Sequence, residues 1–362
     1  MRVPRIIRRI LAGLLCGAAW LAAAADPSCR VAYDLGSSGI RAGASNSNRI
    51  VHLKLDALSL LSAPHQADEA IAPTAMALVA LRRKGGFDPG CRHLGGGFSA
   101  WRRSLEQNPA ALANALARIH AISGVAIVVI PQAREGAYGY QGARQMLGDR
   151  LATSHVLDIG GGSLQVSAKD ASFGAALGQK LWHAELCRAL DRGAANPCAL
   201  QPLSVDELAT ARALLAERLK DIGTRLPGEI TMTSISRPVS RGVHPALRKL
   251  GASGVDAAGF RQSSLGEAIN KLHGLDTDGV AALTGISQPH SSYLLSDLLL
   301  VEGLLQATGG VSIRVAEIDL TNVPGLLADD RTFAWGNKYG CYLDRLKSDG
   351  AAAYASDPAS CD

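Results

Sequence analysis

Two segments of this chain repeat one local pattern, and this repeat constrains the fold more than any other feature. In residues 30–42 an apolar run ends at Asp34, a Gly/Ser turn follows, and the chain returns through small and apolar residues. Residues 156–166 repeat the pattern around Asp158, 124 positions later (158 − 34). Both segments predict β-hairpins whose glycines let the backbone approach a ligand closely. Repetition at this distance predicts two related domains and excludes a short-repeat solenoid.

The segments between and after the hairpins alternate between helical and strand patterns. Asn108 followed by proline is a typical helix start, and Ser204 with Glu207 forms a capping-box pattern. The sequence therefore predicts an α/β protein with a mixed sheet in each half. We expect helices over about 109–120, 134–147, 204–221 and 291–307, and strands over 125–130, 228–236 and 312–318.

The first 25 residues have the pattern of an export signal. Four arginines within the first nine residues precede an apolar run over residues 10–25 that ends in small residues. At 16 residues the run is short for a membrane span, which needs about 20. We therefore expect residues 1–25 to be removed, leaving no stable membrane anchor and an exported protein, periplasmic or secreted.

The charge of the remaining chain bears on its partners. Without those four arginines, 33 basic residues stand against 32 acidic ones, and aromatic residues make up only 4%. A nearly neutral, aromatic-poor chain lacks the basic surface and stacking platforms that nucleic-acid binding needs. We expect no nucleic-acid partner, and the sequence gives no signal for an oligomer.

Six cysteines follow the export segment, which in an oxidising compartment predicts disulfides. No Cys-x-x-Cys pair occurs and no histidine clusters with them in the sequence, which argues against a metal site. Six cysteines allow fifteen pairings. Proximity in the sequence favours Cys187–Cys198 and Cys341–Cys361, with Cys29–Cys91 left over.

The chemistry that the two hairpins suggest is phosphate binding. A glycine turn exposes several backbone N–H groups, which together bind an anion. Two such turns facing one cleft can hold a phosphoryl chain, and an Asp at each strand end can bind Mg²⁺. A base that orients a nucleophile is still required, and we expect it at a strand-to-helix junction facing the same cleft.

At this point the motifs resemble a known superfamily. Residues 34–41 (DLGSSGIR) and 158–165 (DIGGGSLQ) look like the two phosphate loops of actin-like ATPases, most closely those of the exopolyphosphatase/guanosine pentaphosphate phosphatase (Ppx/GppA) family. Residues 98–102 (FSAWR) resemble that family's phosphate-contacting segment. Residues 130–142 resemble its segment with a water-positioning glutamate, which corresponds to Glu135.

Several positions depart from this family's pattern. Ser38 and Gln165 replace an Asn and a Glu, Arg134 replaces the first Glu of a pair, and residues 236–242 (SRPVSRG) stand where a third glycine signature is expected. Some of these changes resemble the ecto-apyrases, which hydrolyse nucleoside di- and triphosphates and are also exported and disulfide-bonded.

The resemblance implies a fold of two actin-like (ribonuclease H-like) domains, with mixed sheets flanked by helices and a cleft between them. We expect domain I over residues 26–150 and domain II over 151–362, with a C-terminal segment that could pack back on domain I. The implied roles are catalysis by Glu135 and metal binding by Asp34 and Asp158. The implied phosphate-binding residues are Gly36, Ser37, Ser38, Arg41, Arg102, Gly160, Gly161, Gly162 and Ser163.

The predicted function is hydrolysis of phosphoanhydride bonds with Mg²⁺ as cofactor and polyphosphate or a phosphorylated nucleotide as substrate. An exopolyphosphatase or guanosine pentaphosphate phosphatase is favoured by the run of three glycines and the order of the last helix and strand. Two alternatives stay open: an ecto-apyrase-like nucleotide hydrolase, and a relative that binds a phosphorylated ligand without turnover.

Overall fold

The protein is described by a computed structural model that covers residues 29–61, 66–193, 195, 197–226, 228–288, 290–318 and 321–361. The predicted export segment, residues 1–25, lies outside these residues. Within the described part of the chain, no helix combines the length and apolar character needed to cross a membrane.

The first half of the molecule is built on a mixed five-stranded sheet in the order β3-β2-β1-β4-β5. Strand β1 pairs antiparallel with β2 and parallel with β4, so the first hairpin occupies the middle and one side of the sheet. Its strands are β1 (Arg30–Leu35), β2 (Gly39–Ala44), β3 (Val51–Lys54), β4 (Arg92–Gly97) and β5 (Ala126–Val129). Its helices are α1 (Ala57–Leu60), α2 (Ile71–Gly85), α3 (Ser99–Gln107) and α4 (Pro109–Ser123).

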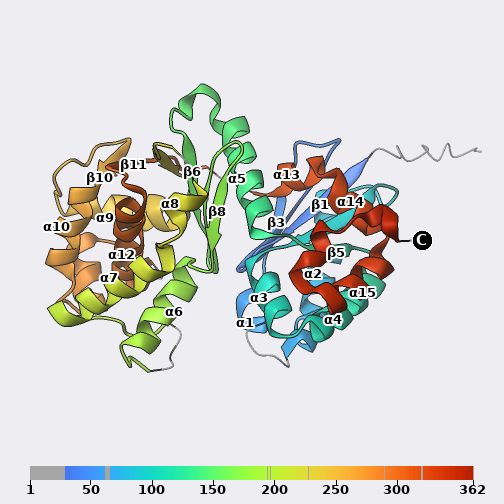
Figure 1. The fold of residues 1–362 in the computed structure, drawn as a ribbon, viewed down its shortest axis with the longest axis horizontal. Coiled ribbons are helices and arrows are strands. Elements are labelled where there is room, and N and C mark those ends of the chain that lie inside the picture. Colours follow the sequence, from blue (N-terminus) through green and yellow to red (C-terminus); the bar gives the residue numbers. More distant parts are fainter. Residues whose placement is uncertain are drawn as a thin grey trace, which may run out of the picture.

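The second half is built on a mixed six-stranded sheet in the order β10-β11-β9-β6-β7-β8. Helix α5 (Gln132–Leu147) leads into it and lies between the halves, packed against β6, β7 and β8 (Figure 1). Its strands are β6 (His155–Ile159), β7 (Leu164–Ser167), β8 (Ser172–Ala175), β9 (Met232–Ser234), β10 (Gly259–Arg261) and β11 (Ser312–Val315). Its helices are α6 (Gln179–Ala189), α7 (Val205–Leu219), α8 (Ile222–Arg225), a π-helix (Pro238–Val243), α9 (His244–Lys249), α10 (Gln262–Leu272), α11 (Thr277–Thr284) and α12 (His290–Thr308).

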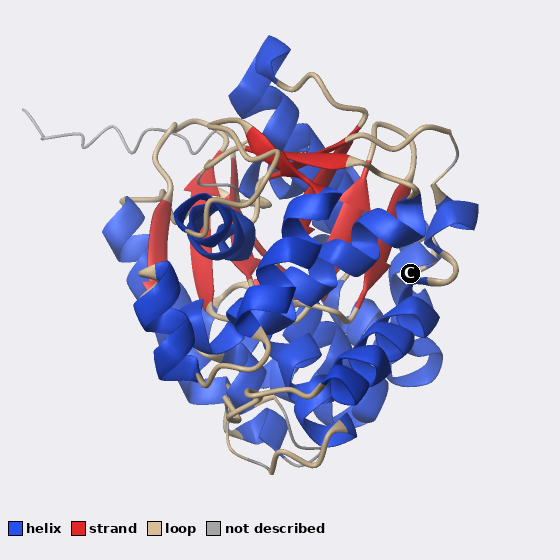
Figure 2. Ribbon diagram, turned by 90° about the vertical axis from the view of Figure 1, so that its left-hand side faces the viewer, coloured by secondary structure: helices blue, strands red, loops and turns tan. Residues whose placement is uncertain are grey.

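The C-terminal segment returns to the first half. Helices α13 (Val323–Ala328), α14 (Asp330–Asn337) and α15 (Tyr339–Asp349) share the apolar core of the first sheet. The hydroxyls of Tyr339 and Tyr342 accept hydrogen bonds from backbone N–H groups of the edge strand β5, at 3.2 and 2.8 Å. The returning helices therefore cover an edge that would otherwise be open to pairing with another chain. Seen from the side, helices enclose the strands of both sheets (Figure 2).

The predicted elements are confirmed in type and position. Both hairpins form, and their registers match: Asp34 lies opposite Arg41, and Asp158 lies opposite Gln165. The expected helices correspond to α4, α5, α7 and α12, and the expected strands to β5, β9 and β11. Strands β9 and β11 are shorter than predicted because the apolar patterns around them continue into loops that pack on the core.

The three disulfides pair as proximity in the sequence favours: Cys29–Cys91, Cys187–Cys198 and Cys341–Cys361. The expectation that no histidine lies near the cysteines is wrong. His183 is one turn before Cys187 on α6, and its Nε2 lies 3.8 Å from the Cys198 sulfur. A spacing of four residues places His183 and Cys187 on the same face of α6, and the disulfide brings Cys198 to that face.

Candidate functional site

A polar cavity of about 540 Å³ lies between the two halves. The turns of both hairpins line it, together with the N-terminal ends of α3 and α6 and residues that follow β11. The two glycine loops thus face one cleft, as the repeated sequence pattern predicts.

The two loops approach each other most closely at Gly162. A β-carbon at Gly162 would overlap the Ser99 hydroxyl at the start of α3 and would lie 3.1 Å from the Ser37 hydroxyl of the first loop. Those two hydroxyls are hydrogen-bonded to each other at 2.7 Å. Gly162 is therefore required here for space, whereas a β-carbon at Gly160 or Gly161 would make only ordinary contacts; none of the three has a φ angle in the left-handed region.

The carboxylate of Asp34 is held by the segment that returns from the second half. Its Oδ2 accepts hydrogen bonds from the Thr321 hydroxyl and from the Asn322 backbone N–H, both at 3.0 Å. Asp34 is 5% exposed and sits at the end of β1, where the sheet opens on the cavity. Thr321 and Asn322 also line the cavity, and both were missed because they lie 287 and 288 positions from Asp34.

Asp158 occupies the equivalent place in the second hairpin but is stabilised differently. Burial and, to a lesser extent, the nearby charges of Glu135 and Asp34 raise the pKa of Asp158 to about 7, although Arg41 and Arg237 act in the opposite direction. Three carboxyl groups thus converge on one side of the cavity. A cation placed among them would relieve their mutual repulsion.

Glu135 lies in the first turn of α5, at the strand-to-helix junction where the base is expected. Its Oε2 accepts a hydrogen bond of 2.6 Å from Arg102, whose guanidinium also donates to the Ile130 carbonyl at 3.0 Å. Burial raises the pKa of Glu135, while the Arg102 charge lowers it and so favours the ionised form. The pair orients a carboxylate that also lines the cavity.

The second loop is supported from behind by helix α6. The Gly160 carbonyl accepts a hydrogen bond from the Gln179 backbone N–H, and the Gly161 carbonyl accepts one from the Lys180 N–H, both at 2.9 Å. The Gln179 side chain in turn donates to Asp297 of α12 at 2.6 Å. Asp297 is 1% exposed, and burial raises its pKa to about 8.

Cationic and imidazole side chains surround the carboxyl groups on the cavity wall. Arg41 is the one that the motif predicts. The others come from β3, the start of α6, the start of α12 and the segment after β9, where residues 236–242 replace the expected glycine signature. The signal that could have found Arg237 is its position just after a strand that is parallel to β6. These residues are Arg41, His52, Lys54, Lys180, Arg237, Arg241 and His290.

The cleft brings together most of the predicted site residues. Those that line it are Asp34, Gly36, Ser37, Ser38, Arg41, Glu135, Asp158, Gly160, Gly161, Gly162 and Ser163. Arg102 is not among the lining residues, because its guanidinium is bound to Glu135 and the Ile130 carbonyl. Gln165 also lies outside this cavity, buried in the hairpin, where its amide donates to the Ser163 hydroxyl at 2.9 Å.

The carboxylate oxygens that line the cleft suit a hard cation such as Mg²⁺, whose other ligands would be waters and phosphate oxygens of the substrate. Among the described residues, a compact group of three possible ligand atoms is formed by His183, Cys187 and Cys198, two of which are oxidised to a disulfide. The carboxyl groups of Asp34, Glu135 and Asp158 do not form such a group, although they line one cavity. Mg²⁺ is commonly bound by one or two carboxylates completed by waters and phosphate oxygens, which this spacing permits.

Comparison with known proteins agrees with this geometry. Residues 113–236 match the model of the Ppx/GppA phosphatase family. An uncharacterized protein of Streptomyces coelicolor is 28% identical over 202 residues, which are 54% of this chain and 57% of that relative. This match therefore spans little more than half of the relative's length.

Solved structures extend the similarity to the whole fold. The Aquifex aeolicus member of the Ppx/GppA family aligns with a TM-score of 0.60 at 14% identity, over 83% of this chain and 96% of that one. An exopolyphosphatase from Cytophaga hutchinsonii aligns with a TM-score of 0.55 at 17% identity, over the same shares. The predicted resemblance to the Ppx/GppA family is confirmed, and these structures confirm the predicted fold of mixed sheets flanked by helices.

Proposed function

We propose that this Ppx/GppA-like chain removes terminal phosphate from inorganic polyphosphate, using water oriented by Glu135 and Mg²⁺ held near Asp34 and Asp158. The observation that carries the proposal is the composition of the cleft. Asp34, Glu135 and Asp158 line the cleft and influence one another's pKa, and arginine and lysine side chains line the same cavity. That arrangement suits a polyanion whose reacting end is neutralised by a metal.

The cleft gives less support to a nucleotide as the preferred substrate. Among its described lining residues the one Phe, Tyr or Trp is Phe98, which is 1% exposed and so offers no open face for a base. Polyphosphate needs only charge and hydrogen bonds along its length. For this reason we place polyphosphate ahead of the ecto-apyrase alternative.

The proposed reaction uses the residues in distinct roles. Backbone N–H groups of the two glycine loops and the cations of the wall hold the phosphate chain. Because Arg102 binds Oε2 of Glu135, the attacking water would be held by Oε1, with Glu135 accepting its proton as the bond to phosphorus forms. The bond to the bridging oxygen breaks in line, releasing phosphate and a chain shorter by one unit. Mg²⁺ supplies charge neutralisation on the reacting phosphoryl group when it is bound.

The test is phosphate release by folded, disulfide-intact protein with Mg²⁺ on polyphosphate, ATP, ADP and guanosine pentaphosphate. We expect the highest kcat/KM on polyphosphate. Glu135→Gln should lower kcat by roughly 10²–10⁴, the range for loss of a general base, with little change in affinity. The matched control is Glu106→Gln, at an exposed position on α3.

Each other result has a definite meaning. Phosphate release no faster than that of Glu135→Gln on every substrate would remove the enzymatic proposal and leave a binding protein. A preference for ADP or ATP over polyphosphate would favour the ecto-apyrase alternative. A loss of affinity as large as the loss of kcat in Glu135→Gln would give Glu135 a structural role.

We also propose that the protein acts outside the cytoplasm. The basic and apolar residues 1–25 and the three disulfides support this location. Cell fractionation with N-terminal sequencing of the mature protein tests it, and recovery of the full-length chain in the cytoplasm with free thiols would contradict it.

A further inference from the structure

A second cavity of about 300 Å³ lies beside the cleft, and Lys180 lines both. We call it the second pocket. Its walls come from α1, α3, α6 and the loop that follows α6. The Leu58 N–H on its α1 side donates to the Ser37 carbonyl of the first glycine loop at 3.1 Å, so this wall is joined directly to the phosphate site.

The second pocket carries positive charge. Arg103, Lys180 and Arg188 line it, and none of its described lining residues is acidic. Lys180 lies 3.8 Å from Asp56, a carboxylate that is about half exposed and is also bound by Ser59. Within the described part of the chain, Arg103 has no ion pair and no side-chain hydrogen bond, so its guanidinium is available to an anion.

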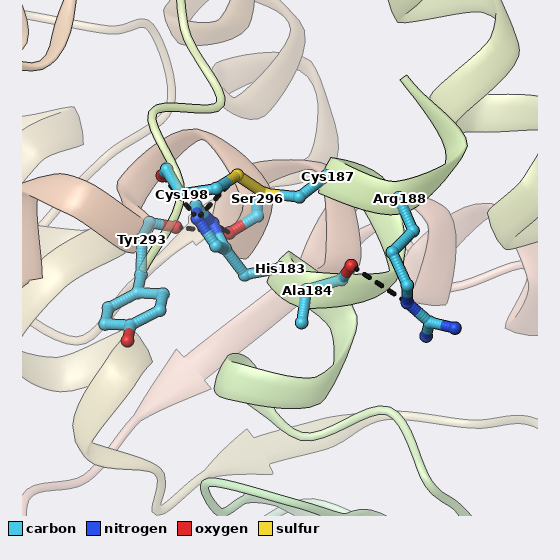
Figure 3. Close-up of a disulfide and its surroundings, with 7 residues drawn as sticks. All are labelled: His183, Ala184, Cys187, Arg188, Cys198, Tyr293 and Ser296. Atoms are coloured by element: carbon cyan, nitrogen blue, oxygen red, sulfur yellow. Dashed lines mark hydrogen bonds between the residues drawn. A yellow bond between two sulfur atoms is a disulfide. The ribbon is translucent and has the colours of Figure 1, made fainter. Parts of the chain in front are cut away.

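The α6 wall of the second pocket belongs to the second half of the molecule and is cross-linked there. The Cys187–Cys198 disulfide ties the following loop to α6, and His183 bridges the Cys198 carbonyl and the Ser296 hydroxyl, each at 3.1 Å (Figure 3). Burial lowers the pKa of His183, so its imidazole serves this wall in the neutral form. Arg188 extends along the helix, where its Nε donates to the Ala184 carbonyl (Figure 3).

Helix α6 connects the cleft with the second pocket and carries a basic residue in each part. Its first residues line the cleft, and Arg188 lies two turns further on, about 12 Å along the helix axis at 1.5 Å per residue. Because Lys180 lines both cavities, a phosphate chain that is bound in the cleft and continues past Lys180 would enter the pocket lined by Arg103 and Arg188.

We propose that the second pocket binds the distal part of a long polyphosphate chain whose terminal phosphate lies in the cleft. This inference rests on the proposed function and adds a preference for chain length. Binding at two connected sites raises affinity without any change at the reacting phosphate, because the second contact is intramolecular.

The test compares a double variant, Arg103→Gln with Arg188→Gln, against a charge-matched control, Lys169→Gln with Lys249→Gln, at two exposed lysines outside both cavities. Lys180 is left intact because it also lines the cleft. Equilibrium binding of tripolyphosphate and of polyphosphate of about one hundred units is measured in the Glu135→Gln background, so that no chain is consumed. Steady-state kinetics on the same two substrates follow in the Glu135-containing protein.

We expect the Arg103/Arg188 variant to weaken long-chain binding by roughly tenfold or more, the effect of losing charge-assisted bonds to two arginines. Tripolyphosphate affinity should change by less than about threefold, and the lysine control should change neither. Equal losses on short and long chains, no loss on either, or the same loss in the control would each overturn the proposal. If no substrate is hydrolysed, the proposed function fails, whereas the binding comparison still decides for or against the second pocket.

Discussion

The two glycine-loop hairpins share one register but are held in place by different means. In the first hairpin, Asp34 accepts hydrogen bonds from Thr321 and Asn322, two neutral donors of the returning C-terminal segment. In the second, no described residue donates a hydrogen bond to the Asp158 carboxylate, whose surroundings include two further carboxyl groups. The duplication therefore conserves the shape of the loop, while the two aspartates have different environments.

The support behind the loops differs as well. The first loop is fixed by bonds between neutral groups, including the pair Ser37–Ser99. The second depends on α6, whose Gln179 is tied to the buried, ionisable Asp297. The contacts that support the first loop therefore do not depend on pH, whereas those that support the second loop include the ionisable Asp297.

The largest effects are expected from substitution of Asp34 and Asp158, the aspartates of the two hairpins. Asp34→Asn and Asp158→Asn should each lower Mg²⁺-dependent turnover by about 10²-fold or more, since each removes charge that would hold the metal. Their effects on stability should differ. Asp34→Asn should cost about 1–3 kcal/mol because it weakens the bonds from Thr321 and Asn322. Asp158→Asn should be neutral or stabilising because it relieves repulsion by Glu135 and Asp34.

Urea denaturation and a Mg²⁺ titration of both variants check these expectations. Equal destabilisation by the two substitutions would contradict the difference between the hairpins. Wild-type turnover and Mg²⁺ response in both variants would instead remove the aspartates from the metal site.

The second prediction concerns Asp297, the buried ionisable residue that binds Gln179 behind the second loop. The pKa of Asp297 is about 8 in the folded protein, against about 4 for an unfolded Asp. Between these values the folded state retains a proton that the unfolded state releases, so this group makes the protein less stable as pH rises from about 4 to 8. Asp297→Asn keeps an acceptor for Gln179 and cannot ionise, so it should be more stable than the wild type at pH 8, by an amount on the order of a few kcal/mol, and equally stable near pH 4.

Denaturation midpoints measured across this pH range, with exposed Asp170→Asn as the control, test the prediction. A stability difference that does not change with pH would show that the Asp297 carboxyl does not titrate between pH 4 and 8. A variant less stable at pH 8 would show that the charged form supports the second loop.

The smallest effect is expected at Thr321, in the C-terminal segment that returns to the first half, and it tests the hydrogen bond from this segment to Asp34. Thr321→Val preserves shape but removes the hydroxyl that donates to Asp34 and accepts from the Val323 N–H at 3.2 Å. We expect a loss of about 1 kcal/mol in the free energy of unfolding. Thr321→Ser should restore most of it. An equal loss in the serine variant would assign the effect to the methyl group rather than to the hydrogen bond.

The hairpins could be predicted because their information is local. An Asp at a strand end and glycines two to five residues later lie within one hairpin turn, so the sequence alone predicts where the backbone can receive a phosphate. Thr321 and Asn322 carry no such pattern. Their contact with Asp34 exists only because the chain crosses to the second half and comes back.

Arg102 shows a different limit of the motif. The sequence predicts an arginine near phosphate, but in the structure the Arg102 guanidinium donates hydrogen bonds to Glu135 and to the Ile130 carbonyl. A motif fixes the residue type, whereas the partner depends on which acceptors lie within reach of a long side chain. Direct phosphate contact by Arg102 stays a prediction.

The return of the C-terminal segment also has a consequence for the order in which the protein can be completed during synthesis. The second sheet uses residues 155–315, one uninterrupted stretch of sequence, so its core can close as soon as that stretch has emerged. The first core includes residues from α13 to Cys361. The N-terminal half, although made first, stays unfinished until the last residues are available, and its Cys341–Cys361 bond can form only then.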